Sequence, residues 1–104
     1  MAYDEKAARL DWMRRKARRV LRTSQHATSL GRVKATSLQG EPIEIEVRRA
    51  MRSKGYQSNY EPVLTYWTIV SDNTGPFQGK SWTANAYAKV RRELEHDYAV
   101  TLPA

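Results

Sequence analysis

Hydrophobic residues near the start of the chain recur every three or four positions, which is the period of an amphipathic helix. Between residues 4 and 24 this stripe consists of Leu10, Met13, Ala17, Val20 and Leu21. The rest of the circumference is mostly cationic, with Arg9, Arg14, Arg15, Lys16, Arg18, Arg19 and Arg22. The pattern predicts a helix over residues 4–24 that packs its apolar stripe on a core and leaves a basic face outside.

Trp12 falls outside this apolar stripe. Helical spacing places its indole beside Arg15, Lys16 and Arg19, on the side that faces away from the core. A large aromatic ring among cations on a solvent-facing surface indicates a binder of a negatively charged partner.

From Gly31 the period changes to two, which is typical of strands. Val33 and Ala35 alternate with polar residues, and after a turn at residues 39–42 a second strand begins. These two segments predict a hairpin.

In the second strand, apolar Ile43, Ile45 and Val47 alternate with charged residues. We expect Glu44, Glu46 and Arg48 on the opposite, solvated face, with Lys34 of the first strand lying across from Glu44 or Glu46.

Residues 49–62 are interpreted as a long loop, and such loops in compact domains tend to be functional. The segment contains Arg49, Arg52, Lys54, Tyr56 and Tyr60. Cations interleaved with tyrosines suit nucleic acid, through phosphate contacts and stacking. The alternative, that the second strand continues to Met51 and the tyrosines pack at the edge of the core, stays open.

Residues 63–70 are β-branched and aromatic throughout, which predicts a central strand with Tyr66 and Trp67 in the core. Residues 71–76 have the composition of a turn. Ser81 is the expected N-cap of a helix over residues 81–98 that buries Tyr87, Val90, Leu94 and Tyr98, and residues 102–104 are expected to fray.

The predicted fold is α+β: one small domain over residues 1–104, with a helix, a three-stranded antiparallel sheet within residues 31–70, and a second helix. This order of elements is similar to that of the double-stranded RNA-binding domain, and Gly79-Lys80-Ser81 stands where the second helix of that family begins. The turn Gln39-Gly40-Glu41 lacks the Gly-Pro-x-His loop of the family, and Lys80 stands alone where a lysine cluster is expected. The resemblance is therefore one of topology.

Charge strengthens the inference of a polyanion partner. The formal net charge is +7. Residues 1–30 hold eight Lys and Arg against three acids, residues 31–62 six against four, and residues 63–104 four against four. The excess on one part of the chain is the asymmetry expected of a one-sided binding surface.

Candidate chemistry is sparse. The chain has no cysteine and two histidines, His26 and His96, neither of them next to a metal ligand or a nucleophile. Glu44 and Glu46 could hold a metal as in a nuclease, but alternating glutamates are far more often a strand surface. We therefore expect no enzyme activity, no cofactor and no metal.

The chain lacks an apolar run of about 20 residues and a leader-like segment, which predicts a cytoplasmic protein. The narrow, alanine-diluted stripe of the first helix argues against membrane binding.

These observations predict a non-catalytic protein that binds DNA or RNA. The expected contact residues are Arg9, Trp12, Arg15, Lys16, Arg18, Arg19, Arg22, Arg49, Arg52, Lys54 and Tyr56. The alternative is an inhibitor or adaptor of the kind found in phages and mobile elements, including anti-CRISPR-type proteins, that presents the same face to an acidic protein or nucleoprotein surface. A homodimer through Leu10, Met13 and Ala17 also stays open.

Overall fold

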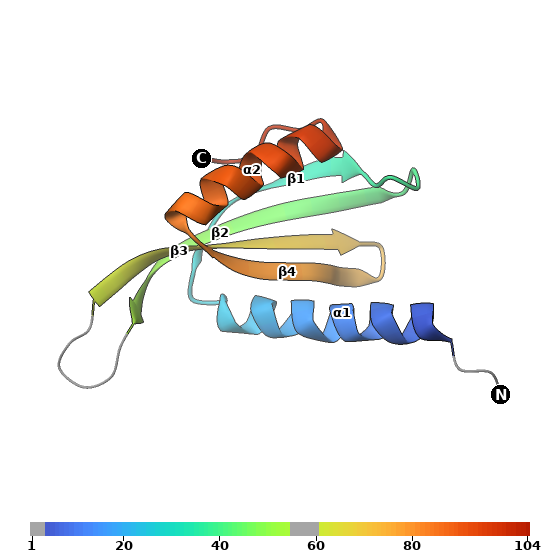
Figure 1. Ribbon diagram of the computed structural model, residues 1–104, viewed down its shortest axis with the longest axis horizontal. Coiled ribbons are helices and arrows are strands. Elements are labelled where there is room, and N and C mark those ends of the chain that lie inside the picture. The colour runs from blue at the N-terminus through green and yellow to red at the C-terminus, as the bar shows by residue number, and fades with distance from the viewer. Residues whose placement is uncertain (1–3, 55–60) are drawn as a thin grey trace.

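The computed structural model describes residues 4–54 and 61–104, which form two helices and one antiparallel sheet of four strands. In chain order the elements are α1 (Glu5–Thr23), β1 (Thr28–Thr36), β2 (Pro42–Lys54), β3 (Glu61–Asp72), β4 (Gly75–Thr83) and α2 (Ala84–Tyr98). The strands are ordered β1-β2-β3-β4, so β1 and β4 are the edges (Figure 1). The α+β class is confirmed, whereas the prediction of three strands is wrong.

The additional strand is β4, which lies where the sequence suggested a turn and the start of a helix. The turn is shorter than predicted, because the Asp72 carboxylate accepts hydrogen bonds from the backbone N–H (2.9 Å) and the hydroxyl (2.7 Å) of Thr74. Gly75 follows with φ +120°, a backbone conformation that glycine tolerates best. The N-cap of α2 is Thr83 instead of Ser81, and its hydroxyl accepts from the N–H of Ala86.

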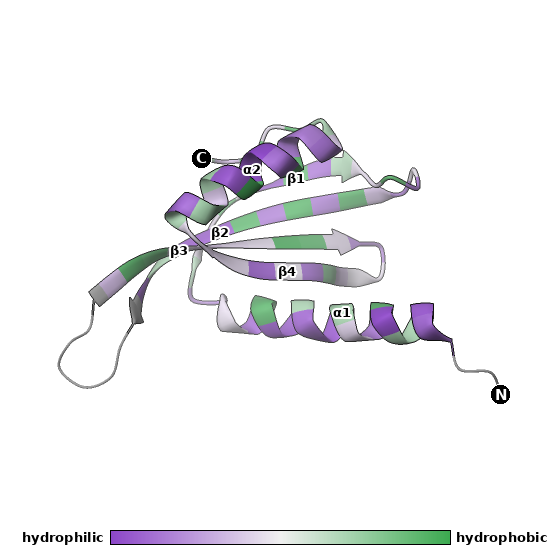
Figure 2. Ribbon diagram, in the orientation of Figure 1, coloured by the Kyte–Doolittle hydropathy of each residue, from purple (hydrophilic) through white to green (hydrophobic). Residues whose placement is uncertain are grey.

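The two helices cover opposite faces of the sheet (Figure 1). On one face, the ring of Tyr87 in α2 stacks on Tyr66 of β3 with 4.2 Å between centroids. Gly79 of β4 is paired with Ile69 and therefore belongs to the other face, where α1 packs. The sheet is thus the middle layer of three (Figure 2).

The larger core lies under α2. It contains Ile43, Ile45 and Val47 of β2, confirming the predicted apolar face, together with Tyr66 and Val70 of β3. Figure 2 shows the alternation of apolar and polar positions along β2. As predicted, Tyr66 and Trp67 are buried, at 7% and 2% exposed, and β3 is an internal strand.

The end of the chain packs on this core instead of fraying. Leu102 is 4% exposed, and its N–H donates to Glu95 Oε2 at 2.8 Å. The hydroxyl of Tyr87 donates to the carbonyl oxygen of Pro103. Burial raises the pKa of Tyr87 to about 12, against the opposing charge of Arg91.

The segment predicted as a loop is largely strand. Residues 49–54 continue β2, and Glu61 and Pro62 begin β3, so that β2 and β3 stay paired as far as Lys54 and Glu61. The part of the alternative in which the second strand continues to Met51 is therefore correct, whereas its placement of Tyr56 and Tyr60 lies outside the described residues. This two-stranded ribbon extends beyond the C-terminal end of α1 in Figure 1.

Candidate nucleic-acid interface

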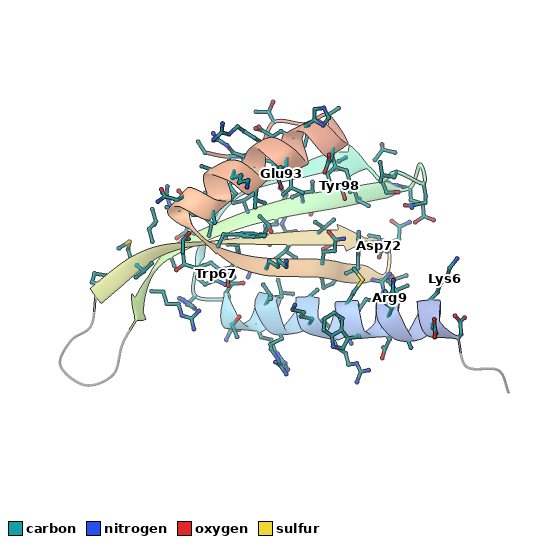
Figure 3. All side chains as sticks on the ribbon, viewed as in Figure 1. Lys6, Arg9, Trp67, Asp72, Glu93 and Tyr98 are labelled. Carbon is teal, nitrogen blue, oxygen red and sulfur yellow. The ribbon has the colours of Figure 1, made fainter. Side chains whose placement is uncertain are left out.

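The outer face of α1 carries a shallow hollow around Trp12. The hollow is lined by Trp12, Arg15, Lys16, Arg18, Arg19, Leu21 and Arg22. The indole of Trp12 is 58% exposed, so the prediction that it faces solvent is confirmed. Figure 3 shows side chains of α1 directed away from the sheet along the length of the helix. Of the contact residues predicted on this helix, Arg9 is exposed but does not line the hollow.

α1 packs on β4 through a narrow apolar stripe. Ala17 is buried against Gly79, and a Cβ atom on that glycine would lie 3.2 Å from the Cα of Ala17. Met13, Val20 and Leu21 are half-buried, whereas Leu10 is 43% exposed. Because this narrow stripe faces β4, the arginines are left toward solvent, and the exposed Trp12 lies between that surface and the edge of β4. Ala17 is also unavailable for the dimer contact considered from the sequence.

Most cations of this face have no internal partner among the described residues. The exception is Arg15, which pairs with Asp11 at 2.7 Å, one helical turn away. Both side chains are more than 60% exposed, and such surface pairs contribute little energy. Lys16, Arg18, Arg19 and Arg22 form no ion pair within residues 4–54 and 61–104; the ammonium of Lys16 instead lies 5.1 Å from the centroid of the Trp12 ring.

Arg14 belongs to the same helix but has a structural role. Its guanidinium forms two hydrogen bonds with the carboxylate of Asp72, at 2.7 and 3.2 Å, and a third with the carbonyl oxygen of Gly75 at 3.3 Å. These contacts fix the middle of α1 to the β3–β4 turn. The hydrogen bond from Arg14 holds the pKa of Asp72 well below its usual range.

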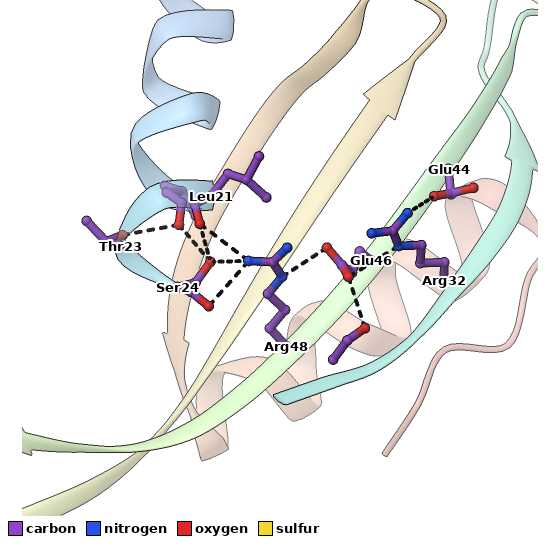
Figure 4. Close-up of polar contacts among 9 residues, drawn as sticks. Leu21, Thr23, Ser24, Arg32, Glu44, Glu46 and Arg48 are labelled. Atoms are coloured by element: carbon purple, nitrogen blue, oxygen red, sulfur yellow. Dashed lines mark hydrogen bonds and ion pairs between the residues drawn. The ribbon is translucent and has the colours of Figure 1, made fainter. Parts of the chain in front are cut away.

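The C-terminal end of α1 is fixed by Arg48, shown in Figure 4. One nitrogen of its guanidinium donates to the carbonyl oxygens of Leu21 and Ser24 at 3.3 Å and to the Ser24 hydroxyl at 3.2 Å. A cation at the C-terminal end of a helix also complements the helix dipole. The prediction of a solvated face on β2 is therefore wrong at this position, because the end of α1 covers it.

Glu46 completes this network and is 7% exposed. It accepts from Arg48 at 3.0 Å, from Ser29 at 2.9 Å and from Arg32 at 3.3 Å. Burial raises the pKa of Glu46, but the Ser29 hydrogen bond and the two guanidiniums outweigh burial and leave the pKa below its ordinary value. Arg32 also approaches Glu44 at 3.6 Å, so cations occupy both carboxylates that the sequence offered to a metal.

The expected cross-strand register holds, since Lys34 lies opposite Glu44.

No group of three or more His, Asp or Glu side chains in the described part of the chain is placed to hold a metal ion. His26 lies edge-on to Trp67, with 5.9 Å between ring centroids, and His96 is 3.6 Å from Asp97 on the surface of α2. Neither described helix is long and apolar enough to cross a bilayer.

Two of the contact residues predicted beyond residue 48, Arg49 and Arg52, do not line the hollow. Arg49 and Arg52 are exposed on β2, an odd number of residues apart, so strand alternation turns them to opposite faces of the ribbon. Lys54 ends β2, and Tyr56 lies outside the described residues. Arg52 shares the α1 face of the sheet with Arg48, whereas Arg49 belongs to the α2 face.

A second concave region was not found from the sequence. It lies between α1, β4 and α2, and its lining includes Trp12, Lys16, Lys80, Trp82, Glu93 and Asp97. This region depends on β4, which was not predicted because its two glycines and its proline are unfavourable in strands. The one signal in the sequence is the spacing of Lys80 and Trp82, which places both side chains on one face of a strand.

Comparison of the chain with protein-family models, with curated proteins and with solved structures gave no match.

Proposed function

We propose that this protein binds nucleic acid, DNA or RNA, without catalysing a reaction, and that the outer face of α1 makes the main contact. The observation that carries the proposal is the hollow around Trp12. An indole that is 58% exposed lies among four arginines and a lysine, and of these cations only Arg15 pairs with a carboxylate in the described part of the chain.

The dimensions of α1 suit a phosphate backbone. Its 19 residues span about 28 Å at 1.5 Å per residue. Guanidinium groups bind phosphate oxygens in a two-pronged geometry, and the cations are distributed over two turns of the helix. Trp12 can stack on a base or lie against a sugar, and stacking on a base contributes about 1–3 kcal/mol.

The absence of catalysis in the proposal follows from the groups available at the hollow. Its lining contains cations, an indole and an aliphatic side chain, and the neighbouring carboxylate of Asp11 is paired with Arg15 at 2.7 Å. A reaction at a bound phosphate would need a base, a nucleophile or a metal at that position.

The test compares two charge-reversed proteins by fluorescence anisotropy at low salt, with labelled DNA and RNA. One carries Arg15→Glu and Arg19→Glu on α1. The other carries Lys89→Glu and Arg92→Glu on α2, where both residues are exposed and do not line the hollow. Both changes alter the net charge equally, so any difference reports on position.

We expect the α1 variant to lose affinity by about tenfold or more, because two phosphate contacts become repulsive. The α2 variant should change only slightly, and the melting temperature of both should stay near that of the wild type. Equal losses in the two variants would mean that overall charge is responsible, and unchanged binding by the α1 variant would refute the proposal.

An acidic protein surface is the competing partner, because Trp and Arg are also favoured anchors in protein interfaces. A pull-down from lysate with and without nuclease treatment separates the two. Capture of nucleic acid that disappears on nuclease treatment supports the proposal, and a protein partner retained equally in both samples contradicts it.

A further inference from the structure

The groove between the two helices crosses the outer edge of β4 and has a volume of about 380 Å³. This volume lies at the small end of the range for ligand clefts, about 300–1,000 Å³. Met13, Val90 and Leu94 contribute apolar lining. Trp12 and Lys16 line both this groove and the hollow on α1, so the two concave regions form one continuous surface.

Two indole rings line the groove, and each has an ammonium group above it. Lys16 Nζ lies 5.1 Å from the centroid of Trp12, and Lys80 Nζ lies 5.4 Å from the centroid of Trp82. Single-strand binding proteins combine cations that contact the backbone with aromatic rings on which bases stack. Here a base would take the place of the ammonium over the ring, and the flexible lysine would move to the adjoining phosphate.

Trp82 is held in place by its surroundings. Its indole N–H donates to the hydroxyl of Thr68 at 3.0 Å, and the ring packs against the buried cluster of Val47, Tyr66 and Tyr87. A fixed ring loses little conformational entropy when a base stacks on it. Trp12, by contrast, projects from the helix and can adjust to the strand.

The wall formed by α2 has the opposite charge. Glu93 and Asp97 line it, and Figure 3 shows Glu93 on that helix. These carboxylates repel phosphates, so a bound backbone would follow α1 and Lys80 while the bases point toward α2. Carboxylates accept hydrogen bonds from the amino groups on base edges, which makes this wall suited to bases instead of phosphates.

Resting on the proposed function, we propose that the groove binds unpaired bases, so that the preferred partner is single-stranded nucleic acid. In a duplex the bases are stacked on one another and paired, and they cannot enter a groove between two helices without being flipped out. A duplex would contact only the arginines of α1. The second indole therefore distinguishes single strands from duplexes.

The test measures binding of one 12-nucleotide sequence, labelled with fluorescein, as a single strand and as a duplex, at matched salt. We expect the single strand to bind more tightly. Trp82→Ala should weaken single-strand binding about tenfold, in line with the loss of one base stack, and change duplex binding little. Trp82→Phe, which keeps an aromatic ring, should recover most of the affinity.

A second measurement covers the case in which Trp82→Ala fails to fold. In a Trp12→Ala protein the remaining indoles are Trp82 and Trp67, and Trp67 is 2% exposed on the opposite face. We expect the single strand to quench the fluorescence of this protein by stacking on Trp82, and the duplex not to quench it. Quenching that is absent with the single strand would overturn the inference.

The outcomes separate the two proposals. Equal affinity for single strand and duplex, with no effect of Trp82→Phe or Trp82→Ala, refutes the groove and leaves the α1 interface standing. If the wild-type protein binds neither the single strand nor the duplex, both the groove proposal and the proposed function are refuted. Tighter binding of the single strand that depends on the ring at position 82 supports both.

Discussion

A single guanidinium, that of Arg48, joins the end of α1 to the sheet. It satisfies two carbonyl oxygens at the end of the helix and also contacts Glu46, which is nearly inaccessible to solvent. Removing one member of a buried ion pair leaves the other charge without its partner, which is costly. Arg48 is therefore a residue on which the position of the basic face depends.

We expect Arg48→Met to lower the free energy of unfolding by about 2–3 kcal/mol. The loss should stay below the upper range for breaking a buried ion pair, because Glu46 keeps its hydrogen bonds from Ser29 and Arg32. Urea unfolding followed by circular dichroism measures this. The control is Arg49→Met, the same change at the next position, where the side chain is exposed. That variant should stay within about 0.5 kcal/mol of the wild type. Equal effects at the two positions would contradict the role given to Arg48.

At this scale the sequence predicted the outward side of α1 better than the polar face of β2. The outward indole of Trp12 follows from the helical period alone, which depends on local geometry. Glu46 and Arg48 were expected in solvent, because they alternate with buried residues on β2. Their burial depends on where the end of α1 docks, and that is a property of distant segments that strand alternation does not contain.

The contact between α1 and β4 is made by small residues. A side chain at Gly79 would place its Cβ 3.1 Å from the Cβ of Val20 and 3.2 Å from the Cα of Ala17. Neither atom is the end of a flexible chain, so the helix itself would have to move. The glycine thus sets how closely α1 approaches the sheet.

Gly79→Val should lower the free energy of unfolding by about 1–3 kcal/mol through overpacking. The matched control is Ser81→Val, on the same face of the same strand, where the side chain is exposed and valine suits a strand. Thermal unfolding of the two proteins measures the difference. A valine at position 79 that is tolerated as well as one at position 81 would show that α1 does not rest on the glycine.

The same residue explains why β4 was missed from the sequence. Glycine and proline are depleted in strands, and the segment from Gly75 to Thr83 contains both. Its first glycine belongs to the turn, and the second makes room for α1. The low strand propensity of this segment therefore reflects what its tertiary packing requires. The strongly apolar β2 and β3 were predicted because their local strand preference and their packing agree.

For the whole molecule, two carboxylates that are paired with arginines link stability to pH. Asp72 and Glu46 have pKa values below their ordinary values, so each binds a proton less readily in the folded than in the unfolded state. Their contribution to stability is present above the unfolded pKa of about 4 and is lost as the pH falls through the folded value. The protein should therefore be less stable in acid.

Asp72→Asn isolates one part of this dependence. At pH 7 the variant should be less stable by about 1–2 kcal/mol, because Arg14 loses its charged partner. Between about pH 5 and about pH 2 the difference in free energy of unfolding from the wild type should shrink, since the wild type loses the interaction that the variant lacks. Urea unfolding at several pH values measures both curves. A difference that stays constant across this range would refute the assignment.

At the level of the whole chain, the predicted α+β class was correct, but the arrangement of the candidate site was only partly foreseen. Residues of one helix stay together in any fold that keeps the helix, so the cluster from Trp12 to Arg22 was predictable. Arg49 and Arg52 were grouped with it on composition, and the strand turns them apart. The groove beside Trp82 joins three elements, and no local pattern predicts such a junction.

The way α1 is attached has a consequence for how the protein would meet a partner. Ala17 is the one buried residue of this helix, and its polar links to the sheet are made by Arg14 near the middle of the helix and by Arg48 at its C-terminal end. Opening α1 would leave the apolar layer under α2 largely intact, so this helix can detach without unfolding the larger core. A partner that recognises only the docked helix would deplete the detached population. Occupancy of the basic face and local folding of the helix would then rise together.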